Sequence, residues 1–178
     1  MNFCSQCGAG VALIIPEGDN RERHVCGDCS TIHYQNPRII TGTLPVHEDK
    51  VLLCKRAIEP RYGLWTLPAG FMENGETTEQ GATRETWEEA SANIENLTLY
   101  TLFNLPYINQ VYFFYRANLS DLNFGPGTES LEVGLFSEDE IPWEELAFPV
   151  ITRTLQLYFD DRNTGHFPVR SEDILRRR

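Results

Sequence analysis

The sequence predicts an α/β protein in which a mixed sheet lies between helices, with a small metal-binding module in front of it. Two observations support this prediction. The periodic segments after residue 36 run in the order strands, helix, strands and closing helix. The first 30 residues hold two CxxC pairs, and a chain of 178 residues is long enough for one substantial core and a small appendage.

The two CxxC pairs have the spacing of a four-cysteine zinc site, with eighteen residues between them. The expected zinc ligands are Cys4, Cys7, Cys26 and Cys29. Two residues between thiolates let one turn aim both sulfurs at one ion, and four thiolates leave no open position for catalysis. Residues 1–35 bury too little apolar surface to fold alone, so we expect a structural Zn²⁺. Two disulfides are the alternative, which the absence of a secretion signal disfavours. We expect His24 and His33 to be surface or packing residues.

The strands are predicted from runs of β-branched, aromatic and leucine residues bounded by turn residues. A proline ends the third strand, and a Pro-Tyr-Ile-Asn stretch joins the next two into a hairpin. The predicted strands lie at 39–46, 51–56, 65–67, 97–105, 110–119 and 132–136.

Two helices are predicted. The first begins at Thr77 or Thr78, because threonine is a good N-cap residue. The second spans 148–159, where apolar residues recur at helical spacing. With a turn at Asn36-Pro37, the pattern predicts a zinc ribbon at 1–35, an α/β domain at 36–165 and a C-terminal tail at 166–178.

The net charge of −11 disfavours nonspecific binding to nucleic acid or to anionic membranes, because it repels phosphate groups. The ribbon holds few basic residues. No stretch approaches the roughly 18 apolar residues of a membrane span, and the first residues have no signal-peptide pattern. We therefore expect a cytoplasmic protein whose partners are neither nucleic acid nor membrane.

The stretch from Gly70 to Ala92 is the most informative part of the sequence. Glu85, Glu88 and Glu89 share one arc of the predicted helix, because residues three and four apart lie on one face. Each like-charge pair costs about 0.2–0.5 kcal/mol, and a hard cation such as Mg²⁺ would offset that cost. A solvated acidic face is the alternative for three clustered glutamates. The fixed spacing of the whole stretch favours a metal site.

This stretch resembles the Nudix box, GX5EX7REUXEEXGU, in which U is a bulky aliphatic residue. The matching residues are Gly70, Glu76, Arg84, Glu85, Glu88 and Glu89. Thr86 and Ala92 stand where the box has bulky aliphatic residues, and Ser91 replaces its last glycine. These are packing or helix-end positions, so the departures concern local packing more than chemistry. The resemblance covers about residues 38–161 and implies the Nudix α/β/α sandwich.

Nudix enzymes hydrolyse a nucleoside diphosphate linked to another moiety, with metal ions at the phosphate oxygens and the attacking water. The resemblance implies catalytic roles for Arg84, Glu85, Glu88 and Glu89. Arg84 would hold the carboxylates in place. Mg²⁺ or Mn²⁺ would bind Glu85, Glu88, Glu89 and the Gly70 carbonyl.

Further roles are expected besides metal binding. The candidates for the general base are Glu85 and two loop glutamates, Glu129 and Glu132. Arg56 and Arg61 are expected to grip the diphosphate through bidentate contacts. The candidates for an aromatic face that stacks on a base are Phe71, Phe103, Tyr107 and Tyr112. Of these, Phe71 is expected at the substrate, together with Glu129.

The substrate class follows from a narrower resemblance. The pieces YQNP, LLCKR, GLWTLPAG and SEDEIPWEELAF are similar to zinc-ribbon Nudix proteins that hydrolyse ADP-ribose and FAD. The NADH pyrophosphatases carry SQPWPFPxS after the box, where this chain has TLFNLPYINQVYFF. We therefore expect ADP-ribose or FAD as substrate, with release of AMP. An NADH pyrophosphatase and a Nudix-fold regulator that binds nucleotides without cleaving them are the alternatives. The resemblance also favours a homodimer.

Overall fold

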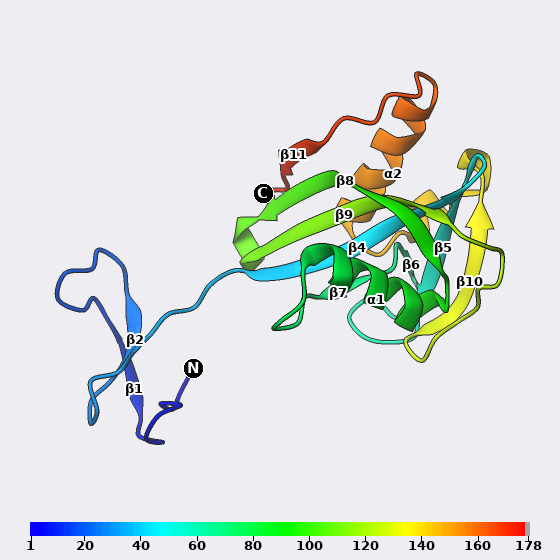
Figure 1. The fold of residues 1–178 in the computed structure, drawn as a ribbon. Helices are drawn as coiled ribbons and strands as arrows, with labels where there is room; N and C mark the ends of the chain where they lie inside the picture. The colour runs from blue at the N-terminus through cyan, green and yellow to red at the C-terminus, as the bar shows by residue number, and fades with distance from the viewer. Residues whose placement is uncertain (177–178) are drawn as a thin grey trace. The chain divides into compact units, whose positions relative to one another are not determined.

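The computed structural model describes residues 1–176, which form two compact units divided at the Asn36-Pro37 step (Figure 1). The first unit is a three-stranded antiparallel sheet of β1 (Val11–Ile14), β2 (Arg23–Cys26) and β3 (Ile32–His33), in that order. Its buried residues are Cys4, Cys26 and His33. So small a core agrees with the expectation that a bound metal stabilises this unit.

The second unit contains one mixed sheet. Its strands are β4 (Arg38–His47), β5 (Lys50–Arg56), β6 (Trp65–Thr66), β7 (Ala69–Phe71), β8 (Ile94–Leu105), β9 (Gln110–Leu119), β10 (Ser130–Phe136) and β11 (Arg170–Asp173). The order is β10-β5-β4-β9-β8-β11, with β6 paired to β5 and β7 paired to β4. The pairs β4–β9 and β8–β11 are parallel and the others are antiparallel, so the sheet is mixed as predicted.

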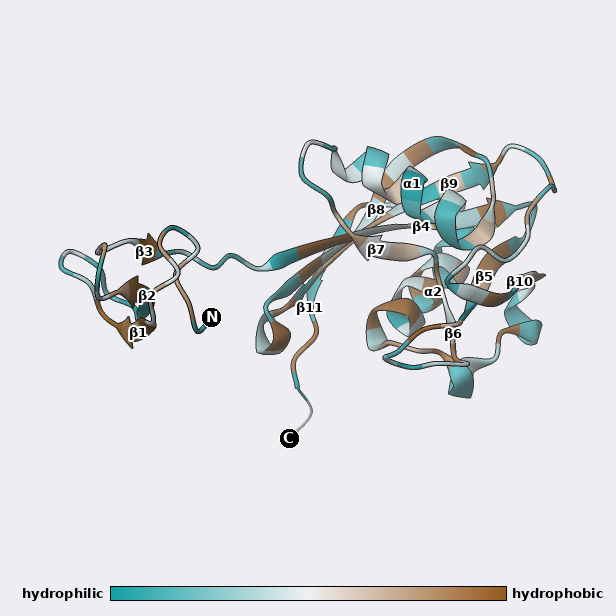
Figure 2. Cartoon of the chain, turned by 90° about the horizontal axis from the view of Figure 1, so that it is seen from below, coloured by the Kyte–Doolittle hydropathy of each residue, from teal (hydrophilic) through white to brown (hydrophobic). Residues whose placement is uncertain are grey.

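Two helices, α1 (Thr78–Ala90) and α2 (Pro149–Arg162), cover opposite faces of this sheet (Figure 2). This arrangement confirms the predicted α/β/α sandwich. Thr77 caps α1, and its side chain and that of Gln80 bond each other's backbone N–H at 3.2 and 2.8 Å. Short 3₁₀ turns lie at Pro106–Ile108, Glu138–Glu140 and Trp143–Glu145. Within the described chain, no helix combines the length and apolar character that crossing a bilayer requires.

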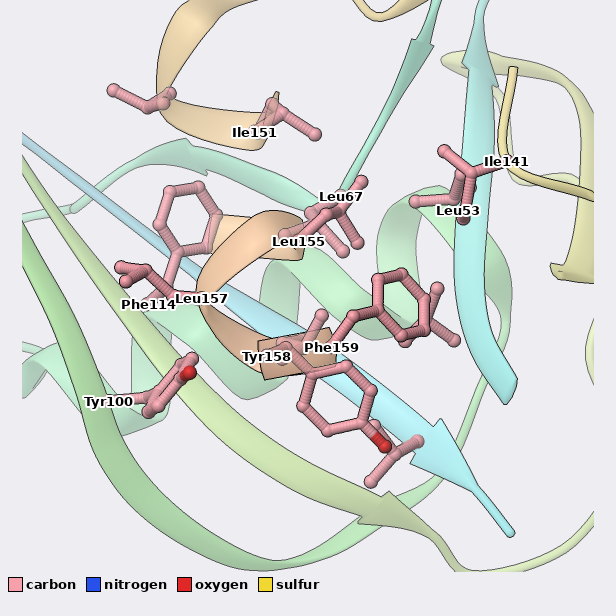
Figure 3. Packing of buried hydrophobic residues seen from close by; sticks show 14 of the residues in the cluster. Leu53, Leu67, Tyr100, Phe114, Ile141, Ile151, Leu155, Leu157, Tyr158 and Phe159 are labelled. Carbon is pink, nitrogen blue, oxygen red and sulfur yellow. The ribbon is translucent and has the colours of Figure 1, made fainter. Parts of the chain in front are cut away.

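The main hydrophobic core lies between α2 and the sheet, where Leu155 and Phe159 of the helix pack with Phe114 of β9 and Leu53 of β5 (Figure 3). The α1 side has a smaller cluster made of Leu52, Cys54, Ala90, Ala92 and Leu119. A Cβ on Gly81 would lie 2.6 Å from Thr41 Cγ2, so α1 lies directly against β4. The carboxylates of α1 are therefore held close to the strand backbone.

The segment 166–178, predicted as a tail, instead contributes a strand within its described part. β11 extends the sheet beyond β8 in parallel register, with Arg170 opposite Thr101. Arg170 pairs with Asp161 of α2, and Arg153 pairs with Glu172 at 2.7 Å. A four-residue strand of mostly charged residues has no apolar alternation, so the sequence pattern could not reveal it. Residues 177 and 178 of the predicted tail lie outside the described residues.

Candidate active site

The carboxylates of α1 face the backbone of β7. Glu85 and Glu89 are buried, with relative exposures of 9% and 5%, whereas Glu88 is exposed. The Ala69 N–H donates to Glu89 Oε2 at 3.2 Å. A Cβ on Gly70 would lie 2.3 Å from a Glu85 carboxylate oxygen. A side chain at position 70 would have to displace the Glu85 carboxylate, so carboxylate oxygens and strand backbone share one small space.

Arg84 ties the box together. Its Nη2 lies 2.8 Å from Glu76 Oε1, and its Nη1 lies 2.8 Å from Glu85 Oε1 and 3.0 Å from Glu88 Oε2. Its Nη2 also donates to the Phe71 carbonyl at 3.2 Å. The hydrogen bond from Arg84 lowers the pKa of Glu76 to about 2. The loop before the helix and the helix face are thus joined through one guanidinium.

The buried carboxyl groups of Glu85 and Glu89 are costly to ionise in the folded protein. Burial raises the pKa of Glu89 to about 8, and burial also raises the pKa of Glu85 against the opposing effect of Arg84. Glu89 accepts the Ala69 N–H but has no ion-pair partner in the described chain. Carboxylate oxygens beside a glycine backbone are a donor set that Mg²⁺ prefers, so these residues fit a divalent cation.

These groups line a cavity of about 810 Å³ in the second unit. The predicted site residues that line it are Arg56, Gly70, Phe71, Arg84, Glu85, Glu88, Glu89 and Glu129. The cavity also has an apolar wall made of Ile40, Ile58, Leu105, Ile108, Tyr107, Tyr112, Phe148, Val150 and Ile151. One cavity therefore combines a carboxylate region with an apolar and aromatic surface.

Arg56 is a buried cation in this cavity, with a relative exposure of 9%. Its Nε donates to the Pro60 carbonyl at 2.9 Å, and its guanidinium lies 5.2 Å from the centre of the Phe148 ring. Among the described residues it has no ion-pair partner within 4.0 Å. Because a buried charge normally needs a partner, Arg56 is suited to an anionic ligand.

Two predicted residues lie elsewhere. Arg61 does not line the cavity; it sits exposed on the loop between β5 and β6 with a φ of 71°. Glu132 is also absent from the lining, and its carboxylate pairs with Lys55 at 2.9 Å. Glu129 is thus the loop candidate for the general base that the structure brings to the cavity.

Of the other aromatic candidates, Tyr107 and Tyr112 line the cavity, whereas Phe103 lies in the main core. Sequence reasoning missed Arg38 and Gln110 as cavity residues. The Arg38 guanidinium lies 5.0 Å from the centre of the Phe71 ring. The Tyr112 hydroxyl donates to Gln110 Oε1 at 3.1 Å. The parallel pairing of β4 and β9 sets Arg38 opposite Gln110, a long-range contact that no local pattern signals.

The four cysteines form a second site, in the first unit. Their sulfurs lie within 4.8 Å of one another, and none forms a disulfide. His33 Nε2 lies 3.3 Å from Cys4 Sγ, so this histidine is a packing residue beside a predicted ligand. The geometry agrees with a structural zinc site and not with two disulfides.

The comparisons with known proteins agree with this geometry. Family models match at residues 2–35 for the Nudix N-terminal zinc ribbon and at residues 37–157 for the NUDIX domain. A NUDIX hydrolase from Nitrosomonas europaea has 56% identity and a TM-score of 0.95, with 99% of this chain and 100% of that chain covered. An ADP-ribose pyrophosphatase from Streptococcus suis, 23% identical with a TM-score of 0.62, covers 78% of this chain and 100% of its own, and shares the fold.

The curated relatives have another name than these two solved structures. A protein from Vibrio atlanticus named NAD-capped RNA hydrolase NudC is 39% identical over 101 residues, which are 54% of this chain and 34% of that protein. A protein of the same name from Chromobacterium violaceum is 28% identical over 156 residues, which are 86% of this chain and 57% of that protein. The chain therefore spans between about a third and three fifths of these two relatives.

Proposed function

The chain belongs to the Nudix hydrolase family, and we propose that it hydrolyses free nucleoside diphosphates linked to a second moiety, with ADP-ribose or FAD preferred. The products would be AMP and either ribose 5-phosphate or FMN. The observation that carries this proposal is one cavity that holds both crowded, buried carboxylates and a buried arginine with no ion-pair partner among residues 1–176. The carboxylates suit a divalent cation and the arginine suits a phosphate, which together match a diphosphate substrate.

The residues that would hold Mg²⁺ or Mn²⁺ are Glu85, Glu88, Glu89 and the Gly70 carbonyl. A cation bound there would neutralise phosphate charge and lower the pKa of an attacking water. Arg84 orients Glu85 and Glu88 through its ion pairs.

Phosphate binding is assigned to Arg56, and the role of general base is assigned to the loop residue Glu129. Arg56 binds a diphosphate oxygen, with its guanidinium already fixed by Pro60 and Phe148. Glu129 accepts a proton from the water that attacks phosphorus, while the bridging P–O bond breaks. Glu129 is preferred to Glu85 as the base because Glu85 is engaged by Arg84, whereas Glu129 has no ion pair in the described chain.

The aromatic part of the cavity is suited to the base of the substrate. The Arg38 guanidinium over Phe71 and the Tyr112 ring offer stacking surfaces, and Gln110 offers an amide for the edge of a base. Stacking of this kind accepts adenine and flavin alike. We therefore assign these four residues to the base of the substrate.

NAD-capped RNA is the second candidate, because the curated relatives are named for it. The charges along the cavity disfavour it. The lining contains six glutamates and three arginines, and one of those arginines already pairs with three glutamates. An RNA chain attached to the cap would need basic residues along its phosphates. The lining charge therefore favours a free nucleoside diphosphate derivative.

The test is an AMP-release assay with Mg²⁺ on ADP-ribose, FAD, NADH and NAD-capped RNA. We expect kcat/KM to be highest for ADP-ribose or FAD. Arg56→Gln should lower kcat/KM about 100-fold through loss of a charged hydrogen bond, whereas Arg61→Gln, a matched change on the same hairpin, should leave it within about threefold. A tenfold preference for NADH or for capped RNA would reject the substrate assignment, and no turnover of any of them would favour a nucleotide-binding regulator.

The family resemblance also supports a homodimer. Sedimentation equilibrium of the purified protein tests this state directly, and a mass of one chain at micromolar concentration would reject it.

A further inference from the structure

The loop at 121–129 runs across the C-terminal end of α1. The Gly125 N–H donates to the Ala90 carbonyl at 2.8 Å, and the Gly127 N–H donates to the Glu89 carbonyl at 3.0 Å. Carbonyls in the last turn of a helix have no partner within the helix. The loop supplies those partners at the turn that carries Glu88 and Glu89, two of the proposed metal ligands.

At Gly127 the loop and the helix are in direct backbone contact. A Cβ at this position would lie 1.7 Å from the Glu88 carbonyl oxygen. The φ of Gly127 is outside the left-handed region, so the glycine is required for space and not for conformation. Gly125 differs, because a Cβ there would meet nothing within 4 Å. Two glycines of one loop therefore have opposite tolerance for a methyl group.

The other end of the loop is fixed beside the proposed phosphate-binding arginine. The Ala57 N–H, which follows Arg56 in the chain, donates to the Glu129 carbonyl at 2.8 Å. The Ser130 N–H donates to the Gly127 carbonyl at 3.2 Å. Residues 127–129 thus bridge the backbone of the metal ligands and the strand of Arg56, and the Glu129 side chain lines the cavity between them.

We propose that Gly127 is a positioning residue, whose contact with the α1 backbone sets the Glu129 carboxylate at the distance from the box glutamates that water attack requires. This inference rests on the proposed function and extends it to a residue outside the Nudix box. A methyl group at position 127 must lift the loop from Glu88, and Glu129, two residues on, moves with it. A displacement of about 1 Å in a reacting group costs on the order of 100-fold in rate.

The test compares Gly127→Ala with Gly125→Ala, a matched change in the same loop. Gly127→Ala should lower kcat about 100-fold while KM changes by less than about threefold, because substrate contacts through Arg56 and the aromatic wall remain. Gly125→Ala should match the parent in both constants. Equal kcat values for Gly127→Ala and the parent would overturn the proposal.

A double-mutant cycle with Glu129→Gln separates positioning from general damage. If Gly127 acts through Glu129, the double variant should have the same kcat as Glu129→Gln alone, because the displaced group is already absent. Multiplied losses would show that Gly127 has a structural role only.

Should Gly127→Ala fold poorly, Pro126→Gly at the exposed neighbouring position loosens the loop without added bulk. Its loss of kcat should likewise vanish in the Glu129→Gln background, and its persistence there would overturn the proposal.

Amide hydrogen exchange gives a readout that needs no substrate. Gly127→Ala should speed exchange at residues 125 and 127 while α1 stays protected, and Gly125→Ala should not. Unchanged exchange in Gly127→Ala would overturn the positioning role. If the parent cleaves none of the nucleotides while Gly127→Ala still loses loop protection, the proposed function is rejected and the loop contact stands.

Discussion

Glu89→Gln is the substitution that most directly measures how much the buried negative charge of the site costs in stability. Glu89 has a relative exposure of 5%, and its carboxylate accepts one backbone N–H, from Ala69 at 3.2 Å. A glutamine oxygen can accept the same hydrogen bond, so the substitution removes the charge and keeps the shape and the helix propensity. Any difference between the two proteins then reports the cost of the buried negative charge.

The cost depends on pH, and its sign follows from the raised pKa. Burial raises the pKa of Glu89 from 4.5 to about 8, so between these values the folded, metal-free protein binds a proton that the unfolded chain does not. The stability that this proton provides is present at low pH and is lost as pH rises through about 8. At 1.36 kcal/mol per pKa unit, a rise from about pH 6 to pH 9 removes about 2–3 kcal/mol, or about 5–10 °C in Tm.

Thermal melts between pH 6 and 9 in EDTA measure this effect. The parent should lose stability across the range and Glu89→Gln should lose less, so that the variant becomes the more stable protein at pH 9. Excess Mg²⁺ should largely offset this loss, since binding at about 100 times Kd adds about 2.7 kcal/mol to the parent. Glu88→Gln, on the exposed side of the same turn, should keep the parental pH dependence. Parallel melting curves for parent and Glu89→Gln in EDTA would refute the reasoning.

Three further predictions concern the scaffold. Ser91→Gly should raise the free energy of unfolding by up to about 1 kcal/mol in urea melts, because Ser91 ends α1 with a φ of 49° that glycine adopts without strain; Ser91→Ala should give no gain. Arg170→Ala should speed amide exchange across β11 and lower stability by about 1–2 kcal/mol, since Arg170 pairs with Asp161, which has a side-chain exposure of 10%. Arg170 also lowers the pKa of Asp161, so this contribution should disappear in acid, as pH falls below the ordinary 3.8. Cys26→Ser should abolish stoichiometric zinc in elemental analysis while the second unit keeps its activity, and a zinc-free parent would contradict the assignment.

The sequence was sufficient for the parts of the fold that local patterns specify. The capping threonine, the strand periods and the two CxxC pairs each depend on neighbours within a few residues, and the structure has all of them. It was not sufficient for contacts between distant segments. β11 forms because the chain after α2 reaches the edge of β8, and its own residues carry no strand pattern.

The same division holds for the site. The box glutamates lie on one turn of helix and could be predicted from their spacing. Arg56 and Arg61 were indistinguishable in sequence, since both precede the box in a polar context. Only the packing of Pro60 and Phe148 around one guanidinium separates the buried arginine from the exposed one.

The three departures from the Nudix box show how packing can change while the carboxylates stay in place. Thr86 is fully buried where the box has an aliphatic residue, and its hydroxyl lies 2.6 Å from that of Thr43 on β4. It also bonds the Ala82 carbonyl at 2.7 Å, so the polar group is satisfied inside the core. Ala92 is small because it packs among Leu52, Cys54 and Leu119. A hydrogen-bonded threonine pair thus joins α1 to the sheet where the box has an aliphatic residue, and Glu85 and Glu89 are still buried on the same helix.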